Sequence, residues 1–435
     1  MGAAGVLAPA TPPPVGIDVA SVARLRAAVE RNPRLARRAY TAAEIRDCER
    51  SPRRWASRWA AKEAVRKLAG SGGLGPGRSP LPAFRDVEVA YDDGGAPRIR
   101  LLQGPPPAVS ISHEGDLVVA VAVGSAGCPD PLDQPPSRPP PQGLVLPPRS
   151  PDAHKGDFGT VVVLAGAHGF SGAAYLAGMG VARGGAGRIR LCVPQTLFPI
   201  VAVKCTEVMA NGLPDGGTGT VGEDSVAALE RDHLPAADVL VAGCGLGQAP
   251  RTVDAVAALL ERLPCPTVVD ADGLNIAALR GVDWRRSGQP LVLTPHPAEM
   301  GRLLGTSARE VQADRVGVAL RYATEHGVVV VLKGAQTVIA GPDGRLTVDG
   351  HRVVALASGG TGDVLAGLIG ALLAGGLGPF DAALAGVTVH AEAGAAVEAT
   401  RGRAGALAGD VVEALPAAQE RLRRALAAVS GGGGS

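Results

Sequence analysis

Two uninterrupted apolar runs constrain the fold of this chain more than any other feature. Thr160–Ala165 reads TVVVLA and Val328–Lys333 reads VVVVLK. A strand with one face in water alternates apolar and polar side chains, whereas a strand buried on both faces is apolar throughout. Strands of the second kind occur in parallel sheets that helices cover on both sides. The chain is therefore predicted to contain an α/β layered domain with a mostly parallel sheet.

Shorter apolar runs complete the predicted sheet, and Ala- and Leu-rich helical stretches alternate with them. The further strands expected are Arg188–Val193, Val239–Ala242, Thr267–Asp270, Leu291–Thr294 and Thr337–Ala340.

A proline-rich segment separates this region from a smaller one. Nine prolines lie between Gly127 and Ser150, and proline neither donates to a strand ladder nor continues a helix. We expect an extended, semi-rigid linker with too few apolar residues to dock firmly. The predicted parts of the 435 residues are a disordered arm (1–14), a first domain (15–125), the linker (126–150), a second domain (151–429) and a Gly/Ser tail (430–435).

The first domain has an α+β pattern. Its expected helices are 21–31 and Arg54–Leu68, and its expected strands are Val15–Val19, Val87–Tyr91, Arg98–Leu102, Val109–Ser112 and Leu117–Val123. The turns Asp93-Gly94-Gly95 and Glu114-Gly115-Asp116 predict that the last four strands form two hairpins.

Charge is distributed unequally between the two parts. Residues 15–125 carry 18 Lys and Arg against 12 Asp and Glu, and residues 126–435 carry 25 against 29. The basic first domain suits an acidic partner or a phosphorylated ligand, or simply presents a solvated basic face. Basic residues interleaved with aromatic ones are missing, which argues against nucleic acid.

The cysteines and the apolar stretches indicate a cytoplasmic protein. Six scattered cysteines without a C-x-x-C pattern argue against a zinc site or a disulfide framework and fit a reducing cytosol. The beginning of the chain does not read as a secretory signal. The longest apolar helix expected, Val364–Ala374, is too short to span a bilayer, so no membrane partner is expected.

Three places in the first domain carry residues suited to chemistry. Asp18 ends a short strand and is placed to bind a hard cation or to cap a helix. Glu63 and Lys67 share a helix face, either beside a ligand or as a surface salt bridge. His113 stands at a hairpin turn, where it either meets a ligand or only completes the turn.

Four motifs in this domain occur together: GID near its start, the YTxxE run of Tyr40, Thr41 and Glu44, then WAAKEA and SISH. In this order they resemble the holo-acyl-carrier-protein synthase family over nearly all of residues 15–124. Trp59 stands where that family usually has Phe.

The resemblance implies that the domain transfers 4′-phosphopantetheine from coenzyme A to a serine of an acyl carrier protein. It implies that Asp18 and Glu63 bind Mg²⁺, that Lys62 and Glu63 are catalytic, and that Lys62, Lys67 and His113 bind coenzyme A. Arginines of the first helix and beyond would meet the acidic carrier protein. The family also implies a homo-oligomer, a trimer with its site between subunits.

In the second domain, the most informative stretch is SGGTGDVLAGLIGALL, 358–373. Gly359, Gly360 and Gly362 let backbone N–H groups surround an anion at the start of an apolar helix. Asp363 follows in the first turn, where it suits a general base or a helix-start carboxylate favoured by the dipole.

Other turns follow predicted strands. Lys333 and Thr337 are candidates for nucleotide contact, and His296 lies in a rigid loop between two prolines. Asp270 and Asp272 follow a strand, where metal or substrate contact and turn capping are equally expected.

The motifs HKGDFG, GFSGAA, TPHP, KGAQT and GGTGD resemble, in this order, the ADP/ATP-dependent NAD(P)H-hydrate dehydratases of the ribokinase-like superfamily. Cys244 stands where the family commonly has proline. The resemblance implies that hydrated NAD(P)H (NAD(P)HX) and ADP or ATP are substrates. The hydrated dinucleotide would contact Ala173, Gly245, His296 and Asp363, and the adenine nucleotide would contact Lys333, Gly334, Ala335, Gln336, Thr337 and Gly362.

The two resemblances together imply an α+β phosphopantetheinyl-transferase domain followed by an α/β ribokinase-like layered domain. The alternative for the second domain is a vitamin kinase for hydroxymethylpyrimidine or thiazole, since GGTGD is shared with such kinases. The alternative for the first domain is a non-catalytic oligomerisation or docking module.

Overall fold

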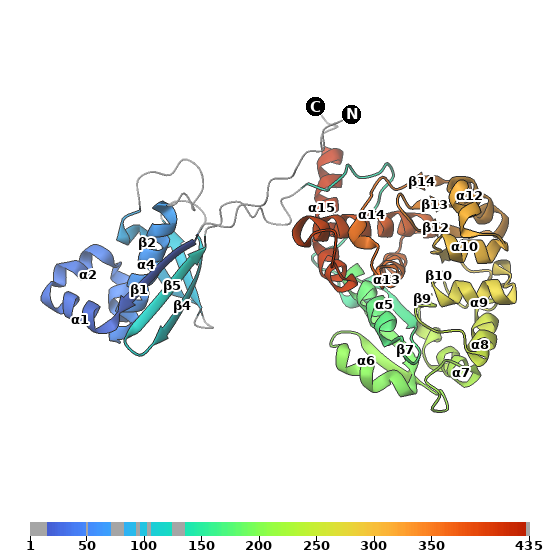
Figure 1. The fold of residues 1–435 in the computed structure, drawn as a ribbon, viewed down its shortest axis with the longest axis horizontal. Coiled ribbons are helices and arrows are strands. Elements are labelled where there is room, and N and C mark those ends of the chain that lie inside the picture. The colour runs from blue at the N-terminus through green and yellow to red at the C-terminus, as the bar shows by residue number, and fades with distance from the viewer. Residues whose placement is uncertain are drawn as a thin grey trace. The chain divides into compact units, whose positions relative to one another are not determined.

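The computed structural model describes residues 15–48, 51–70, 82–92, 96–101, 106–123 and 135–431, and it divides between Pro131 and Leu132 into two compact units (Figure 1). The predicted arm, the Asp93-Gly94-Gly95 turn and residues 432–435 of the predicted tail lie outside the described residues.

The first unit contains an antiparallel sheet in the order β1-β5-β4. Its strands are β1 (Val15–Ser21), β4 (Ala108–Glu114) and β5 (Leu117–Val123), and a separate hairpin joins β2 (Val87–Tyr91) to β3 (Pro97–Leu101). Gly115 turns β4 into β5 with a φ of +55°, a value that glycine adopts without strain. The two predicted strand pairs are therefore confirmed.

The helices of this unit are α1 (Val22–Arg31), α2 (Pro33–Ala39), α3 (Ala42–Cys48) and α4 (Pro52–Gly70). Ser21 caps α1 as the sequence suggests, since its side chain accepts a hydrogen bond from the backbone N–H of Arg24 (3.1 Å). Gly16 lets α4 pack tightly on β1, because a Cβ there would lie 2.0 Å from the carbonyl oxygen of Ala64. Small alanines of α4 fill the core above the sheet.

The second unit is built on a nine-stranded sheet in the order β14-β13-β12-β11-β10-β9-β6-β7-β8. Its strands are β6 (Thr160–Leu164), β7 (Arg188–Pro194), β8 (Met209–Leu213), β9 (Val239–Ala242), β10 (Thr267–Val269), β11 (Leu291–Leu293), β12 (Val329–Leu332), β13 (Val338–Ala340) and β14 (Leu346–Val348). All neighbours from β12 to β8 are parallel, and at the other edge β13 pairs antiparallel with both β12 and β14. The predicted mostly parallel sheet is confirmed.

Helices cover both faces of this sheet, as the uninterrupted apolar strands predict (Figure 1). Along β6, Val161 and Val163 enter one core, while Val162 and Leu164 enter the other. The first core packs against α5 (Ser171–Gly184), α6 (Phe198–Lys204), α13 (Thr361–Ala374), α14 (Pro379–Arg401) and α15 (Ala408–Gly431). The second packs against α7 (Glu223–Asp232), α8 (Pro250–Leu260), α9 (Asp272–Arg280), α10 (Pro297–Leu304), α11 (Ala308–Ala313) and α12 (Arg315–His326).

The segment expected to be an undocked linker differs from that expectation. Residues 135–149 lie on the second unit, where Leu144 and Leu146 are buried in its core. The guanidinium of Arg149 stacks 3.7 Å from the ring centroid of Phe158. Two buried leucines and a few polar contacts are therefore sufficient to hold residues 135–149 on the second unit, although the segment is rich in proline.

Among the helices that the structure describes, none is long and apolar enough to cross a membrane.

Candidate active sites

The first candidate site lies where β1 meets α4 in the first unit. Asp18 is on β1 with its side chain 13% exposed, and its Oδ1 accepts a hydrogen bond from Nζ of Lys67 (2.7 Å). Lys67 also donates to the carbonyl oxygen of Ile17 (3.0 Å). The structure thus brings together two of the residues expected to act here, one acidic and one basic.

Glu63 and His113 are accessible. Glu63 lies one turn before Lys67 on α4 and forms an ion pair with Arg66 (3.0 Å), not with Lys67 as the spacing had suggested. His113 is exposed near the end of β4. Both side chains can therefore reach a ligand from solvent.

Lys62 occupies a different place from the one expected. Its side chain is fully buried, and Nζ donates to Oε2 of Glu44 (2.7 Å) and to the carbonyl oxygens of Ala39 (2.8 Å) and Phe84 (2.9 Å). These three bonds use all three donors of the ammonium group. Burial lowers the pKa of Lys62, which the hydrogen bond and charge of Glu44 oppose. We correct the expectation and do not include Lys62 among residues that touch coenzyme A.

The second candidate site lies at the start of α13 in the second unit. Gly360 precedes the helix with a φ of +92°, a left-handed conformation that favours glycine. Asp363 follows in the first turn. Burial raises the pKa of Asp363 to about 7, and the negative charge of Asp270 adds to the effect. A carboxyl group with such a pKa can exchange protons near neutral pH.

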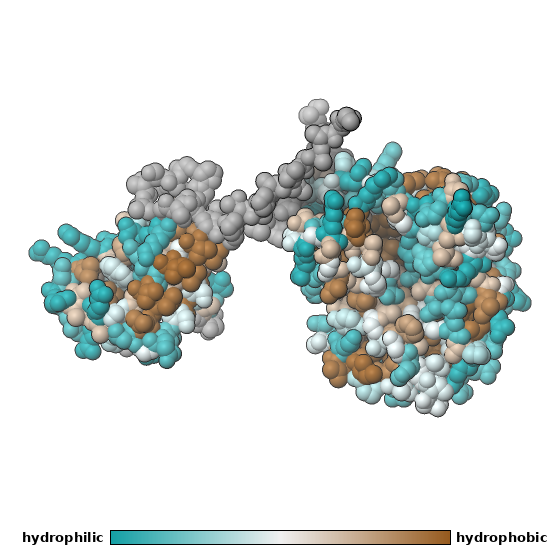
Figure 2. Space-filling view, viewed as in Figure 1, coloured by the Kyte–Doolittle hydropathy of each residue, from teal (hydrophilic) through white to brown (hydrophobic). Residues whose placement is uncertain are grey.

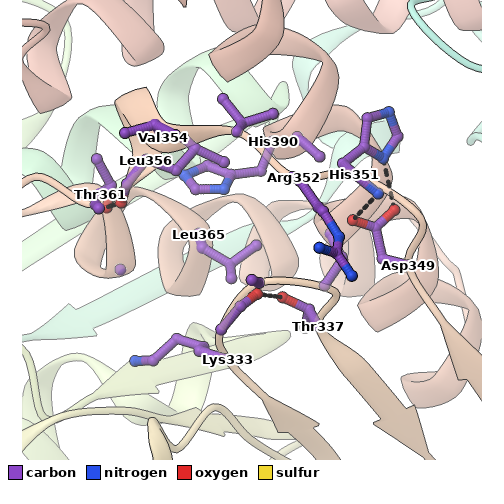
Figure 3. A pocket seen from close by; sticks show the side chains of 17 residues that line it. Lys333, Thr337, Asp349, His351, Arg352, Val354, Leu356, Thr361, Leu365 and His390 are labelled. Atoms are coloured by element: carbon purple, nitrogen blue, oxygen red, sulfur yellow. Dashed lines mark hydrogen bonds and ion pairs between the residues drawn. The ribbon is translucent and has the colours of Figure 1, made fainter. Parts of the chain in front are cut away.

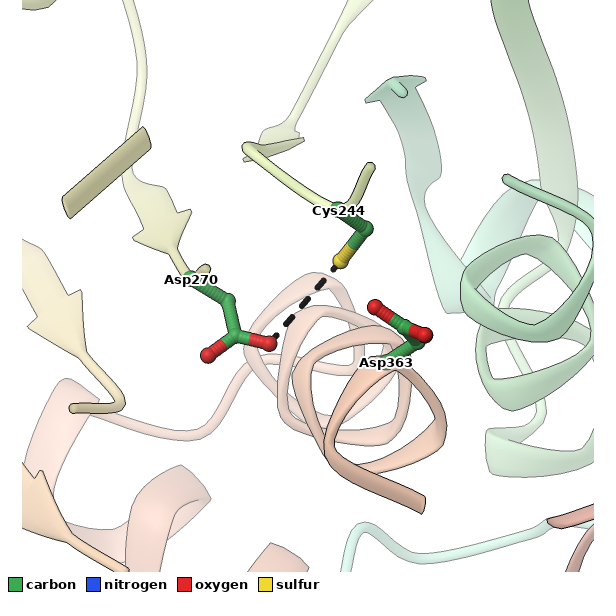
Figure 4. Close-up of side chains that lie close together, drawn as sticks. All are labelled: Cys244, Asp270 and Asp363. Carbon is green, nitrogen blue, oxygen red and sulfur yellow. Dashed lines mark hydrogen bonds between the residues drawn. The ribbon is translucent and has the colours of Figure 1, made fainter. Parts of the chain in front are cut away.

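Three side chains from different elements converge beside this helix start (Figure 4). Cys244 follows β9, Asp270 follows β10, and each of them and Asp363 offers one ligand atom within 4.8 Å of the others. Sγ of Cys244 lies 4.0 Å from Oδ2 of Asp270. A thiol is a poor ligand for hard cations such as Mg²⁺. The cluster is therefore better suited to proton chemistry than to holding such a metal.

Lys333 places a positive charge against this cluster. Its Nζ donates to Oδ1 of Asp270 (2.6 Å) and lies 3.8 Å from Oε2 of Glu299. Burial opposes the charge, but Asp270 and Glu299 outweigh it and raise the pKa of Lys333. Oδ1 of Asp270 also accepts from the hydroxyl of Thr294 (2.7 Å). Asp270, which the sequence left open between a ligand and a turn residue, thus holds the lysine.

A cavity of about 390 Å³ opens next to Lys333 (Figure 3). Five of the six residues expected to bind the adenine nucleotide line it: Lys333, Gly334, Ala335, Thr337 and Gly362. Gln336 is not among its lining residues; its backbone has a φ of +62°, and its Oε1 accepts from Arg352 (2.7 Å). The structure therefore gathers nearly the whole predicted nucleotide set in one cavity.

The residues expected to contact the dinucleotide lie elsewhere. A Cβ on Gly245 would be 2.8 Å from Cβ of Ala173, so these two residues adjoin. Gly245 follows Cys244, whose thiol belongs to the cluster around Asp363. His296 caps α10, since its Nδ1 accepts from the backbone N–H groups of Ala298 (3.0 Å) and Glu299 (3.2 Å). Asp363 thus lies next to Gly362 of the nucleotide cavity and close to Cys244, the neighbour of Gly245.

Two residues near the site were given no role from the sequence: His390, which lies in no motif, and Glu299, which ends the run LTPHPAE. His390 lies on α14, is buried and lines the cavity, and its Nε2 has no hydrogen-bond partner among the described residues. Burial lowers the pKa of His390 to about 4, so the ring is neutral. Burial also raises the pKa of Glu299 to about 7. Only the fold brings these residues to Lys333.

Family comparisons agree with this division of the chain. Residues 161–417 match the family model of NAD(P)H-hydrate dehydratase, and residues 14–122 match that of the 4′-phosphopantetheinyl transferase superfamily.

Individual relatives match mainly the second unit. A bifunctional NAD(P)H-hydrate repair enzyme of Moorella thermoacetica is 40% identical over 271 residues, which cover 62% of this chain and 51% of the relative. An ADP-dependent (S)-NAD(P)H-hydrate dehydratase of Neisseria meningitidis is 37% identical over 282 residues, covering 64% and 90%. This chain spans about half the length of the curated bifunctional relatives that it matches.

A solved structure supports the same assignment. An ADP/ATP-dependent NAD(P)H-hydrate dehydratase from Bacillus subtilis, co-crystallised with ATP and Mg²⁺, superposes with a TM-score of 0.56 at 31% identity. The superposition covers 64% of this chain and 94% of the other. Residues 14–122 resemble the 4′-phosphopantetheinyl transferase superfamily, and the chain belongs to the NAD(P)H-hydrate dehydratase family.

Proposed function

We propose that the second unit dehydrates the S form of hydrated NAD(P)H to NAD(P)H at the expense of ADP, giving AMP and phosphate. The observation that carries this proposal is the place of Asp363. It lies next to Gly362 of the cavity and close to Cys244, the neighbour of Gly245. A nucleotide in the cavity and a dinucleotide beside Ala173 and Gly245 would present their reacting groups to one carboxylate.

The chemistry follows from the poor leaving ability of the hydroxyl group on the hydrated nicotinamide ring. Asp363 accepts the hydroxyl proton, the oxygen forms a bond to the terminal phosphorus of ADP, and the bond between that phosphorus and AMP breaks. The ring nitrogen then donates its lone pair and phosphate departs with the C–O bond electrons. Loss of a proton from the neighbouring carbon restores the ring double bond.

The start of α13 and Lys333 would stabilise the transferring phosphoryl group. A Cβ on Gly362 would lie 3.4 Å from Nζ of Lys333, so the ammonium borders the glycine turn. Backbone N–H groups at a helix start and a fixed cation both favour the negative charge of a phosphate. Asp270 holds the ammonium in place before the nucleotide arrives.

The test is to incubate the purified full chain with hydrated NADPH and ADP, to follow the return of NADPH absorbance and to measure AMP. Recovery of NADPH with one AMP for each molecule repaired is expected. The variant Asp363→Asn should lose this recovery. Asp224→Asn is its matched control, because Asp224 is also in the first turn of a helix but is exposed. A stable phosphorylated vitamin and no NADPH recovery would instead indicate the kinase alternative.

For the first unit, we propose 4′-phosphopantetheine transfer from coenzyme A to a serine of an acyl carrier protein. Asp18 and Glu63 are the candidate Mg²⁺ ligands. Two carboxylates on adjoining elements suit a hard cation, and at present Lys67 and Arg66 balance their charges. When bound, Mg²⁺ would neutralise charge on the pyrophosphate of coenzyme A.

In the transfer, Glu63 accepts the proton of the serine hydroxyl and the serine oxygen forms a bond to the β-phosphorus. The bond between the two phosphates breaks, and the nucleotide half of coenzyme A leaves with its phosphate oxygen. Lys67 and His113 are proposed to hold phosphate oxygens of coenzyme A. Glu63 is proposed as the catalytic carboxylate, whereas Lys62 is buried and forms an ion pair with Glu44.

Charge and exposure support an acidic protein partner. Six exposed arginines lie on α1 and α2: Arg24, Arg26, Arg31, Arg34, Arg37 and Arg38. Such a basic surface attracts an acidic carrier protein and increases the rate of encounter.

A homo-oligomer, and for the first unit a trimer, is part of the proposal. Five large apolar side chains of β1 and β5 are at least 36% exposed: Val15, Ile17, Val19, Leu117 and Val119. Figure 2 shows a hydrophobic area on this unit. Apolar patches of this kind mark interaction surfaces, and a second copy of the unit would cover them.

We place the protein in the cytoplasm, where both proposed substrates are expected.

The test is a parallel assay of transfer and of dehydration with Asp18→Ala, Glu63→Ala and the exposed control Glu30→Ala. The first two variants should lose transfer at limiting Mg²⁺ and keep dehydration. Transfer at the wild-type rate by either would reject the metal assignment.

A further inference from the structure

Residues 135–149, named here the strap, are anchored on the second unit by one buried carboxylate. Glu392 of α14 is 2% exposed, and Ser137 donates to it from both its backbone N–H and its hydroxyl, each at 2.8 Å. The backbone N–H of Arg138 adds a third bond (3.1 Å). Three hydrogen bonds to one ionised group form a strong attachment.

The same carboxylate holds a histidine in the wall of the nucleotide cavity. Nε2 of His351 lies 3.0 Å from Oε1 of Glu392, and its Nδ1 lies 2.6 Å from Oδ1 of Asp349. Burial opposes a charge on the ring, but the hydrogen bonds to Asp349 and Glu392 raise the pKa of His351 to about 9. A protonated imidazole between two carboxylates has one favoured orientation, because both of its N–H groups are used.

The cavity wall around His351 is joined to the loop expected to bind the nucleotide. The backbone N–H of Asp349 donates to the carbonyl oxygen of Thr337 (2.8 Å), and that of Gln336 donates to the carbonyl oxygen of His351 (3.3 Å). Asp349, His351 and Arg352 line the cavity together with Thr337 (Figure 3). Movement of His351 would therefore move the loop 334–337 with it.

The strap also touches this wall directly. A Cβ on Gly350 would lie 2.9 Å from the guanidinium carbon of Arg138. Arg138 thus covers the backbone between the two cavity residues Asp349 and His351. Two independent contacts, one through Glu392 and one on Gly350, connect the strap to the same wall.

We propose that the strap is a positioning element of the nucleotide site: Ser137 and Arg138, through Glu392 and His351, fix the wall and the loop that bind the adenine nucleotide. The inference rests on the proposed function, because that function places a nucleotide in this cavity. None of the strap residues needs to touch the nucleotide for this role.

The test uses Ser137→Pro in the full chain, which removes the backbone N–H and the hydroxyl that Glu392 accepts from. ADP affinity is measured by calorimetry and steady-state kinetics with hydrated NADPH. The dissociation constant and KM for ADP are expected to rise about tenfold, the effect of losing hydrogen bonds to a charged group. The kcat should change less than twofold, since Asp363 and Lys333 remain in place.

Three further variants make the result specific. Pro139→Ala alters an exposed residue of the same strap and should leave ADP affinity unchanged. Glu392→Gln should weaken ADP binding as Ser137→Pro does, and the double variant should be no weaker than the worse single one, because both changes break one connection.

Two outcomes overturn the inference. If wild-type protein binds ADP but Ser137→Pro and Glu392→Gln lower only the melting temperature, the strap is a packing element without a role in the site. If the wild-type protein does not bind ADP, the proposed function itself is wrong, and this inference is wrong with it.

Discussion

At the scale of single residues, the proposed dehydration depends on the environment of Asp363. The carboxylate is largely withdrawn from water and lies beside Asp270, so its negative charge is disfavoured and its pKa lies at about 7, although a hydrogen bond with Cys244 opposes this shift. A group at that pKa is a stronger base than an exposed carboxylate, and it is still substantially ionised at neutral pH.

Asp363→Asn should retain the fold and bind ADP, but lose dehydration by about 10²–10⁴-fold, the scale of removing a general base. Asparagine keeps the size of the side chain and cannot accept the hydroxyl proton. Calorimetry with ADP and recovery of NADPH absorbance measure the two effects. Turnover within a few-fold of wild type would make Asp363 a helix-start residue and direct the search to Asp272.

The rate should also depend on pH in a defined direction. The base is active only when deprotonated, so kcat should rise tenfold per unit at low pH and level off above an apparent pKa of about 7. An ordinary aspartate would give a plateau from about pH 5 upward. A kcat profile that is flat between pH 5 and 8, with the chemical step rate-limiting, would contradict the assignment.

The residues of the two candidate sites divide into those whose place the sequence predicts and those whose place it does not predict. Lys333, Thr337 and Gly362 stand in short motifs, and they line the cavity as predicted. Lys62 stands in an equally clear motif, yet it is buried against Glu44, which lies 18 positions away. A motif identifies a residue type and its neighbours; it does not determine which side of a helix faces solvent.

At the scale of elements, the buried pair of Lys62 on α4 and Glu44 on α3 connects two helices of the first unit. The other oxygen of Glu44 accepts from the backbone N–H of Val89 in β2 (2.9 Å), so three elements meet at one carboxylate. This arrangement explains physically why the YTxxE and WAAKEA motifs occur together.

Glu44→Gln should destabilise the first unit by about 3–5 kcal/mol, because it leaves the ammonium of Lys62 buried without its counter-charge. The control is Glu30→Gln, which breaks the exposed ion pair with Arg26 and should cost at most about 0.5 kcal/mol. Urea unfolding is followed by tryptophan fluorescence, in which Trp55 and Trp59 report on this unit and Trp284, whose signal both variants share, reports on the second. Equal midpoints for the two variants would show that the pair contributes little.

The strands were predicted correctly where burial on both faces makes the strand sequence apolar throughout. β6 and β12 are apolar throughout because helices cover both of their faces, and both strands were found from composition alone. β8 reads MANGL and forms the opposite edge of the sheet from β14, so neither apolarity nor alternation marks it. The short helices α2 and α3 were missed because seven residues carry too little periodicity.

At the scale of the whole molecule, the boundary of the second unit is the feature that composition alone could not locate. Nine prolines indicate a linker over Gly127–Ser150, yet the described part of that segment belongs to the second unit. The segment is held on the second unit by a few particular contacts: Leu144 and Leu146 are buried in the core, and Ser137 bonds to Glu392. The composition averaged over 24 residues does not show these contacts.

Expression of the two units separately should show where the second one begins. A fragment 132–435 should keep dehydration, and a fragment 1–131 should keep pantetheinyl transfer, because the chain divides at that point. A fragment 150–435 should melt at a lower temperature and bind ADP more weakly. It lacks Ser137 and Arg138, and it loses two leucines whose burial contributes about 1.5–3 kcal/mol each. Melting curves and ADP titrations of the fragments 132–435 and 150–435 measure the two differences. Equal melting temperatures and equal ADP affinities would show that the segment before Ser150 is only a linker.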